Sequence, residues 1–137
     1  MNLHPRNTKR NAERVVDPLL DQLGRALGLE LGSRIIRMTP VDTGRAQCNW
    51  NTSVGEPEAT VTDQAVKGGG PALNRLAGTV ADLKIADGDT MYLTNGLPYI
   101  EPLNEGTSVQ APEKWIEQAT GQVQKMVPRV AKRVRRG

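Results

Sequence analysis

The chain has 137 residues, of which 37% are hydrophobic and 3% aromatic with no Phe, so we expect one domain around a small aliphatic core. It has no run of 18 apolar residues and only one cysteine, so we expect no membrane span and no internal disulfide, as suits a reducing cytoplasm. The net charge is +3, but residues 15–124 hold 8 bases and 14 acids, whereas the ends, at about 1–14 and 129–137, are basic and expected to be flexible.

Asp17-Pro18 predicts the start of a long helix, because Asp accepts amide hydrogen bonds at the N-cap and Pro has no amide to satisfy. Apolar residues then recur every three or four positions as far as Ile35, and Thr39-Pro40 ends the helix near Met38. Three glycines repeat at four-residue spacing inside it: Gly24, Gly28 and Gly32. Each costs roughly 1 kcal/mol relative to alanine, so we expect another element to pack closely over them, either from the same chain or from a second subunit.

The middle of the chain predicts a small antiparallel sheet. Strands are expected at about 46–54, 59–63 and 90–95, and the first two are joined by a hairpin turn. A short amphipathic helix is expected at about 73–83, and a last helix starts near residue 112 and is kinked or restarted at Pro128. The predicted fold is α+β: a long N-terminal helix, a small antiparallel sheet of three or four strands and a C-terminal helix.

Prolines and glycines punctuate the connection between the third strand and the last helix. Asn95-Gly96 ends the strand, and Pro98 and Pro102 bracket a stretch that is too short for more than one helical turn. A second turn follows at Glu105-Gly106-Thr107-Ser108. Such a connection predicts a segment with a fixed shape. It contains no evident set of catalytic residues, and a shaped surface of this kind favours contact with another protein.

Residues 39–45 are predicted to form a turn, in which Asp42 and Thr43 can bond nearby backbone amides and Gly44 supplies a permissive conformation. Asp42-Thr43-Gly44 is also the tripeptide of dimeric aspartic proteases, in which two carboxylates share a proton. That chemistry needs the tripeptide at a strand end, and a neighbouring cation such as Arg45 would keep both carboxylates ionised. A transition-metal site needs clustered ligands, whereas His4 and Cys48 are the only His and Cys and lie far apart. We therefore expect no catalytic residue, no metal and no cofactor, and keep a dimeric aspartic protease as a remote alternative.

Two segments of the chain together resemble a known family. The first segment is Thr39-Pro40-Val41-Asp42-Thr43-Gly44-Arg45, followed by Trp50. The second comprises Asn95-Gly96-Leu97-Pro98-Tyr99, Leu103-Asn104-Glu105-Gly106-Thr107-Ser108 and Gln110-Ala111-Pro112. In this order and at this separation they resemble the signature of the tail-completion, or neck, proteins of tailed phages of the siphophage type.

The resemblance implies a virion structural protein of the head–tail junction that is made in the cytoplasm of a bacterial host. It implies a ring of copies of the chain, six in number, that completes or terminates the tail and joins it to the connector. The implied partners are the chain itself, the adjacent neck connector and tail tube proteins, and genomic DNA passing through the channel. The residues implied at contacts between subunits are Asp42, Thr43, Gly44, Arg45, Tyr99, Glu105, Gly106, Thr107 and Pro112.

The basic C-terminal end is a separate candidate surface. Its cations are Arg129, Lys132, Arg133, Arg135 and Arg136. In a ring we expect them to meet an adjacent ring or the passing DNA. In the alternative hypothesis the chain is a non-specific nucleic-acid-binding protein that uses its basic termini, because attraction to phosphates needs no base readout. The sequence carries no helix-turn-helix or zinc signature for base recognition.

Overall fold

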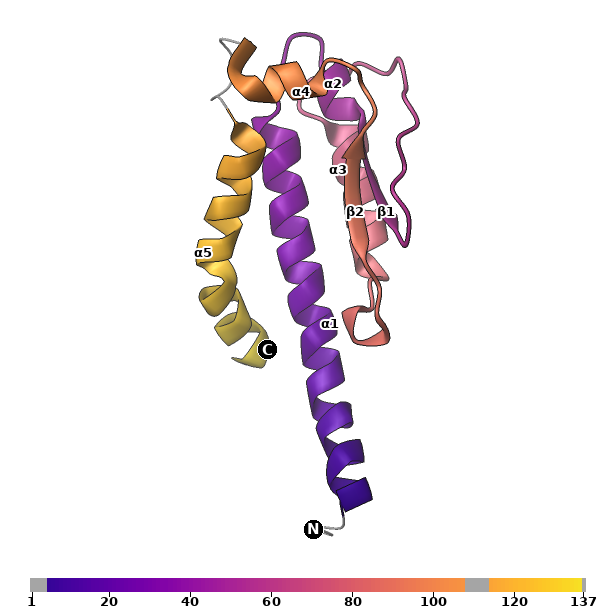
Figure 1. The fold of residues 1–137 in the computed structure, drawn as a ribbon, viewed down its shortest axis with the longest axis vertical. Helices are drawn as coiled ribbons and strands as arrows, with labels where there is room; N and C mark the ends of the chain where they lie inside the picture. The colour runs from indigo at the N-terminus through magenta and orange to yellow at the C-terminus, as the bar shows by residue number, and fades with distance from the viewer. Residues whose placement is uncertain (1–4, 108–113, 137) are drawn as a thin grey trace.

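The computed structural model describes the backbone of residues 5–107 and 114–136, and the side chains of residues 17–106 and 114–136. A long helix, α1 (Pro5–Met38), runs through the middle of the molecule (Figure 1). The last helix, α5 (Trp115–Arg136), packs along one side of α1, and the sheet and α3 (Gly70–Ala81) lie on the other side. The remaining elements are α2 (Arg45–Cys48), β1 (Trp50–Val54), η1 (Ile85–Asp87), β2 (Met91–Asn95), α4 (Ile100–Pro102) and the π-helical turn η2 (Leu103–Thr107).

Helix α1 begins at Pro5, well before the predicted start at Asp17-Pro18, and it continues through Pro18. Residues 5–17 contain no glycine and several good helix formers, which offsets the single amide that Pro18 lacks. The helix ends at Met38, as predicted. There the Thr39 hydroxyl donates to the Ile35 carbonyl oxygen at 2.6 Å and accepts from the Trp50 indole N–H at 2.9 Å, which ties the end of α1 to the start of β1.

The glycine-bearing face of α1 is covered by other parts of the same chain. An alanine Cβ at position 32 would lie 2.6 Å from Cδ1 of Leu76 on α3, and one at position 28 would lie 3.1 Å from Sδ of Met91 on β2. At Gly24 the nearest side chain is Ile85 of η1. The three glycines therefore let α3, β2 and η1 approach the α1 backbone. The sequence left open whether the covering element belongs to the same chain or to a second subunit, and here it belongs to the same chain.

Within the described residues the sheet has two antiparallel strands, with Trp50 opposite Asn95 and Val54 opposite Met91. The prediction of three or four strands was wrong, because residues 59–63 are not a strand. Side chains bind this segment instead. Asn51 donates to the Thr60 carbonyl oxygen at 2.8 Å, and Asn49 both donates to Thr62 O at 3.0 Å and accepts from Thr62 N–H at 2.8 Å.

Two further stretches fold as helix where strand or loop was predicted. Residues 46–48, expected to open the first strand, lie instead in the single turn α2, whose last amide donates to the Gly44 carbonyl oxygen at 3.0 Å. The stretch between Pro98 and Pro102 holds the short helix α4, which fits the expected single turn, but the chain then continues into η2, where a separate turn was expected at 105–108. Pro102 is compatible with this because it lies in the first turn, where backbone amides have no partner within the helix.

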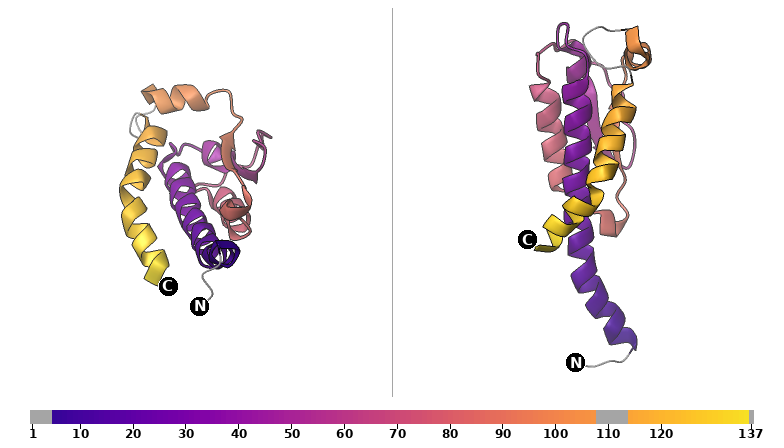
Figure 2. Two further views of the ribbon diagram at one scale, coloured as in Figure 1. Left: turned by 60° about the horizontal axis from the view of Figure 1, so that its bottom comes forward. Right: turned by 90° about the vertical axis from the view of Figure 1, so that its left-hand side faces the viewer.

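Helix α5 continues through Pro128 without a break, and Figure 2 shows it curving along α1 towards its C-terminal end. Pro128 is exposed, so its missing amide lies on the solvent side of the helix. The core is aliphatic, as the composition predicts, with two tryptophans added to it. Its most buried members include Ile36, Trp50, Ala72, Leu76, Trp115 and Ala119.

Candidate subunit interface

The described parts of the two family-like segments, residues 39–50 and 95–107, approach each other at one end of the molecule, although about 50 residues of sequence separate the segments. The turn before α2, α2 itself, α4 and η2 all cluster at the end opposite the N-terminus (Figure 1). The Asn95 side-chain amide, at the end of β2, donates to the Ala46 carbonyl oxygen in α2 at 2.9 Å and joins the two parts. We call this region the motif end.

The Asp42–Arg45 turn is anchored by Gly44, which has φ of +88° and is buried. A Cβ at this position would collide with the backbone of Val66 and Lys67. The Arg45 amide donates to the Thr43 hydroxyl at 3.2 Å, and the Arg45 guanidinium lies 3.4 Å from the exposed Asp63 carboxylate. Such an exposed pair contributes little to stability. The side chains of Asp42 and Thr43 are exposed.

The second segment combines exposed and buried side chains. Tyr99 and Glu105 are exposed, whereas Ile100 is buried and holds α4 on the core. Gly106 has φ of +104°, a conformation that favours glycine, and breaks the helical path of η2. The side chain of Thr107 and all of Pro112 lie outside the described residues.

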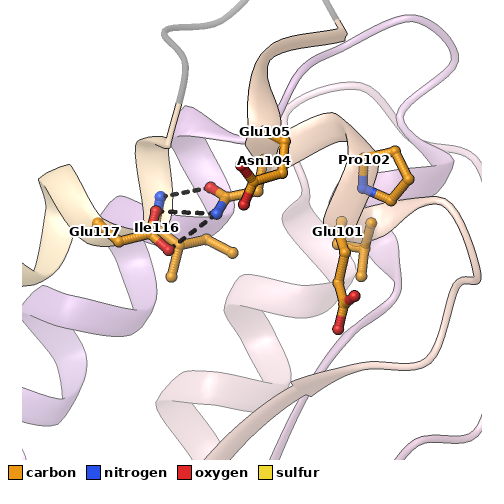
Figure 3. A pocket seen from close by; sticks show the side chains of 7 residues that line it. Glu101, Pro102, Asn104, Glu105, Ile116 and Glu117 are labelled. Atoms are coloured by element: carbon orange, nitrogen blue, oxygen red, sulfur yellow. Dashed lines mark hydrogen bonds between the residues drawn. The ribbon is translucent and has the colours of Figure 1, made fainter.

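Asn104 fastens this segment to the start of α5, and its side chain is only 7% exposed. Its amide nitrogen donates to both oxygens of the Glu117 carboxylate, at 2.9 and 3.1 Å, and its amide oxygen accepts from the Ile116 N–H at 3.1 Å (Figure 3). Its backbone carbonyl oxygen accepts from the Lys114 N–H. Asn104 therefore satisfies amides at the N-terminus of α5 from a distant point in the chain.

The sequence did not single out Asn104 as a site residue, although it lies inside the second segment. The available signal was the preference of Asn for capping helix N-termini. That preference normally applies to a residue just before the helix, whereas α5 begins 11 residues after Asn104. Only the folded arrangement shows which helix it caps.

Replacing Asn104 by alanine should destabilise the protein by about 1–3 kcal/mol, because the Ile116 N–H and the Glu117 carboxylate lose their partner. The measurement is urea unfolding followed by tryptophan fluorescence. Asn51→Ala is the matched control, since Asn51 is half-buried and donates one 2.8 Å bond to a loop carbonyl. Equal losses for the two variants would contradict the role given to Asn104.

The bond from Asn104 also lowers the pKa of Glu117 below its ordinary value of 4.5, and the Glu117 backbone amide acts in the same direction. A lowered pKa in the folded state means that the ionised carboxylate stabilises the fold above about pH 4.5, and that this contribution is lost as the pH falls through the folded-state value. We expect the stability gap between the native protein and Glu117→Gln to narrow between pH 7 and about pH 3. A stability difference that does not change with pH would contradict the stabilising role of the ionised Glu117 carboxylate.

A groove lies between α4 and η2 on one side and the start of α5 on the other, with a volume of about 540 Å³. Figure 3 shows Glu101 and Pro102 on one side of it, Ile116 and Glu117 on the other, and Asn104 and Glu105 between them. The complete lining is Ile100, Glu101, Pro102, Asn104, Glu105, Ile116 and Glu117. The groove thus combines three apolar residues with three carboxylates in its lining, and we call it the acidic groove.

The basic C-terminal residues lie at the other end of α5. Arg129, Lys132, Arg133, Arg135 and Arg136 are exposed. Among the residues whose side chains are described, none of these five forms an ion pair. Their charge is therefore available to an external partner, and we call this stretch the basic end of α5.

The geometry gives the chemical alternatives little support. Asp42 lies in an exposed turn between two helices, not at the strand end that an aspartic protease requires. Among residues 17–106 and 114–136, whose side chains are described, no cluster of three or more His, Cys, Asp or Glu side chains is placed to hold a metal ion. In the same part of the chain, no helix is both long and apolar enough to cross a membrane.

Comparison of the chain with protein-family models, curated proteins and solved structures found no match. The features that bear on function are the two family-like segments and the surfaces that the fold presents. The surfaces are the motif end, with its acidic groove, and the basic end of α5.

Proposed function

We propose that this protein is a phage virion structural protein of the head–tail junction, where copies of the chain form a ring that completes or terminates the tail and joins it to the connector. In this role it binds and does not catalyse. Its partners are other copies of itself, the adjacent neck connector and tail tube proteins, and the genomic DNA that crosses the channel. Six copies per ring is the number that the family resemblance implies.

The observation that carries the proposal is the meeting of the two family-like segments at one end of the fold. A short stretch of sequence can match by chance, but two separated stretches that converge on one surface form a single structural unit (Figure 1). The motif end presents exposed Asp42, Thr43, Tyr99 and Glu105 on buried anchors. Among these anchors, Gly44 and Asn104 fix the backbone of each segment.

The shape of this surface suits a contact between proteins. Tyr99 is 37% exposed at the start of α4, and exposed tyrosines on rigid backbone frequently contribute most of the energy at interfaces. The core contains no Phe and few aromatic residues, so surface buried in an assembly would add stability that a single copy lacks.

Sedimentation of the purified protein tests the proposal, alone and after mixing with tail tube and connector proteins. We expect a ring in at least one of these conditions and expect Tyr99→Arg to abolish it. Val54→Arg is the matched control, because Val54 has a similar exposed fraction, 42%, and lies at the end of β1 away from the motif end. A native protein that stays monomeric in every condition would refute the proposal.

A second candidate function, non-specific binding of nucleic acid, is favoured by the exposed cations at the basic end of α5. If it holds, changing Arg129, Lys132, Arg133 and Arg136 to Gln should reduce DNA retention and lower the dependence of log K on log salt by about 0.9 per lost phosphate contact. Changing the exposed Arg37, Lys67 and Lys84 to Gln is the control. Absence of DNA binding by the native protein at low salt would exclude this function.

A further inference from the structure

We propose that the acidic groove of one copy receives the basic end of α5 of a second copy. This inference rests on the proposed ring and deepens it, because it names the two surfaces that meet between neighbours. The carboxylates of Glu101, Glu105 and Glu117 line the groove, and its lining includes no Lys or Arg among the residues whose side chains the structure describes. Lys114 adjoins the groove and interacts with Glu117, which leaves the local charge at about −2 by simple counting of these four groups.

The basic end of α5 matches the groove in charge and in form. Lys125, Arg129, Lys132 and Arg136 follow one another at spacings of three and four, so they form one stripe along the helix. Arg133 and Arg135 lie on either side of the stripe, and all six side chains are exposed. The last three turns of α5 therefore present a cationic ridge, made of Lys125 and the basic end of α5.

The lining of the groove suits these particular side chains. Ile100, Pro102 and Ile116 supply apolar surface in the same groove as the carboxylates. Lys and Arg pack their aliphatic stems on such surface while their charged heads reach carboxylates at the rim. A phosphate backbone would be repelled by the same carboxylates, so the groove itself favours a basic helix over nucleic acid.

The basic end that fills a groove must come from another copy. Helix α5 is continuous over 22 residues, a length of about 33 Å, with the groove at its first turn and the cations in its last turns. A chain cannot fold this helix back into its own groove. The contact therefore joins two copies of the chain. Copies that each fill the groove of the next close into a ring or extend as a filament, whereas two copies that fill each other's groove close a two-fold dimer. The proposed ring requires the first arrangement.

Charge exchange between two variants tests the contact. The groove variant carries Glu101→Lys and Glu105→Lys. The ridge variant carries Arg129→Glu, Lys132→Glu, Arg133→Glu and Arg136→Glu, so that only Lys125 and Arg135 remain as cations and the charge of the ridge becomes about −2. Glu117 is left unchanged because Asn104 binds it. At about 0.1 M salt each variant alone should assemble at least tenfold more weakly than the native protein, since each then has two surfaces of like charge.

Mixing the two variants should restore assembly. The basic groove of one then accepts the acidic ridge of the other, and the native groove of the second accepts the native ridge of the first. The control variants carry charge reversals of the same sign at exposed sites outside both surfaces: Glu56→Lys with Asp82→Lys, and Arg37→Glu with Lys67→Glu and Lys84→Glu. The control variants should assemble like the native protein, and circular dichroism should show that the groove variant, the ridge variant and both controls are folded.

The outcomes separate the two proposals. If the native protein assembles and the variants either assemble normally or fail to rescue one another, the groove–ridge contact is wrong and the ring proposal stands. If the native protein does not assemble alone or with tail tube and connector proteins, both are refuted. If the ridge variant loses DNA retention but assembles normally, the basic end serves nucleic acid and the contact is again wrong.

Discussion

Replacing Gly44 by alanine should destabilise the fold by roughly 2–5 kcal/mol. Two costs add at this position. The backbone has φ of +88°, a left-handed conformation that a side chain disfavours, and a Cβ would also collide with the Val66 backbone. Because backbone atoms cannot rotate away as a side chain can, the 66–67 loop would have to move. We expect the Asp42–Arg45 turn, and with it the motif end, to lose its fixed position.

Gly55→Ala provides a matched control for this prediction. Gly55 has φ of +89°, almost the same as Gly44, but a Cβ there would have no heavy atom within 4 Å. It therefore carries the conformational cost of roughly 1–2 kcal/mol without the collision. Urea unfolding followed by tryptophan fluorescence measures both variants. If Gly44→Ala costs no more than Gly55→Ala, the close approach of the 66–67 backbone to Gly44 is contradicted.

Gly32→Ala should have the second large effect on the stability of the fold. Whether the added methyl group stabilises or destabilises the fold should depend on the side chain of Leu76. Alanine at an interior helix position is normally stabilising by about 1 kcal/mol relative to glycine. Here the added methyl would lie 2.6 Å from Leu76 Cδ1, and Leu76 is fully buried. Overpacking of this kind typically costs about 1–3 kcal/mol, so we expect a net loss of stability.

A double-mutant cycle separates the two contributions at Gly32. Leu76→Ala alone should cost about 2–5 kcal/mol through the cavity that it leaves. In that background the obstructing side chain is gone, and Gly32→Ala should become neutral or stabilising. Gly78→Ala, at a helical position where a Cβ meets nothing within 4 Å, is the control for helix propensity alone. An unchanged penalty for Gly32→Ala in both backgrounds would contradict the packing of α3 on the glycine face.

The parts of the fold that periodicity specifies were predictable from the sequence. The apolar stripe of α1 and its end before Pro40 were predicted, as were α3, β2 and a C-terminal helix. The same rules placed a strand at 59–63, where Thr60 and Thr62 alternate with apolar residues. Their carbonyl oxygens accept from the side chains of Asn51 and Asn49 instead of from a neighbouring strand. Sequence patterns do not distinguish these two sources of hydrogen bonds.

The candidate site was predictable where local turn chemistry determines it. Asp42-Thr43-Gly44 was predicted as a turn with a permissive glycine, and the structure gives Gly44 a positive φ. The role of Asn104 was not predictable, because its partners at Ile116 and Glu117 become neighbours only when α5 packs beside η2. Pro102 was taken for a helix breaker, although a proline in the first turn of a helix leaves the rest of the helix intact.

Locating this chain in an image of an intact phage particle tests the central proposal most directly. The proposal predicts copies arranged as a ring in the neck, with the motif end, marked by Asp42 and Tyr99, in contact with a neighbouring copy. A particle in which the chain is absent from the neck, or in which the motif end faces solvent and touches no second chain, would contradict it.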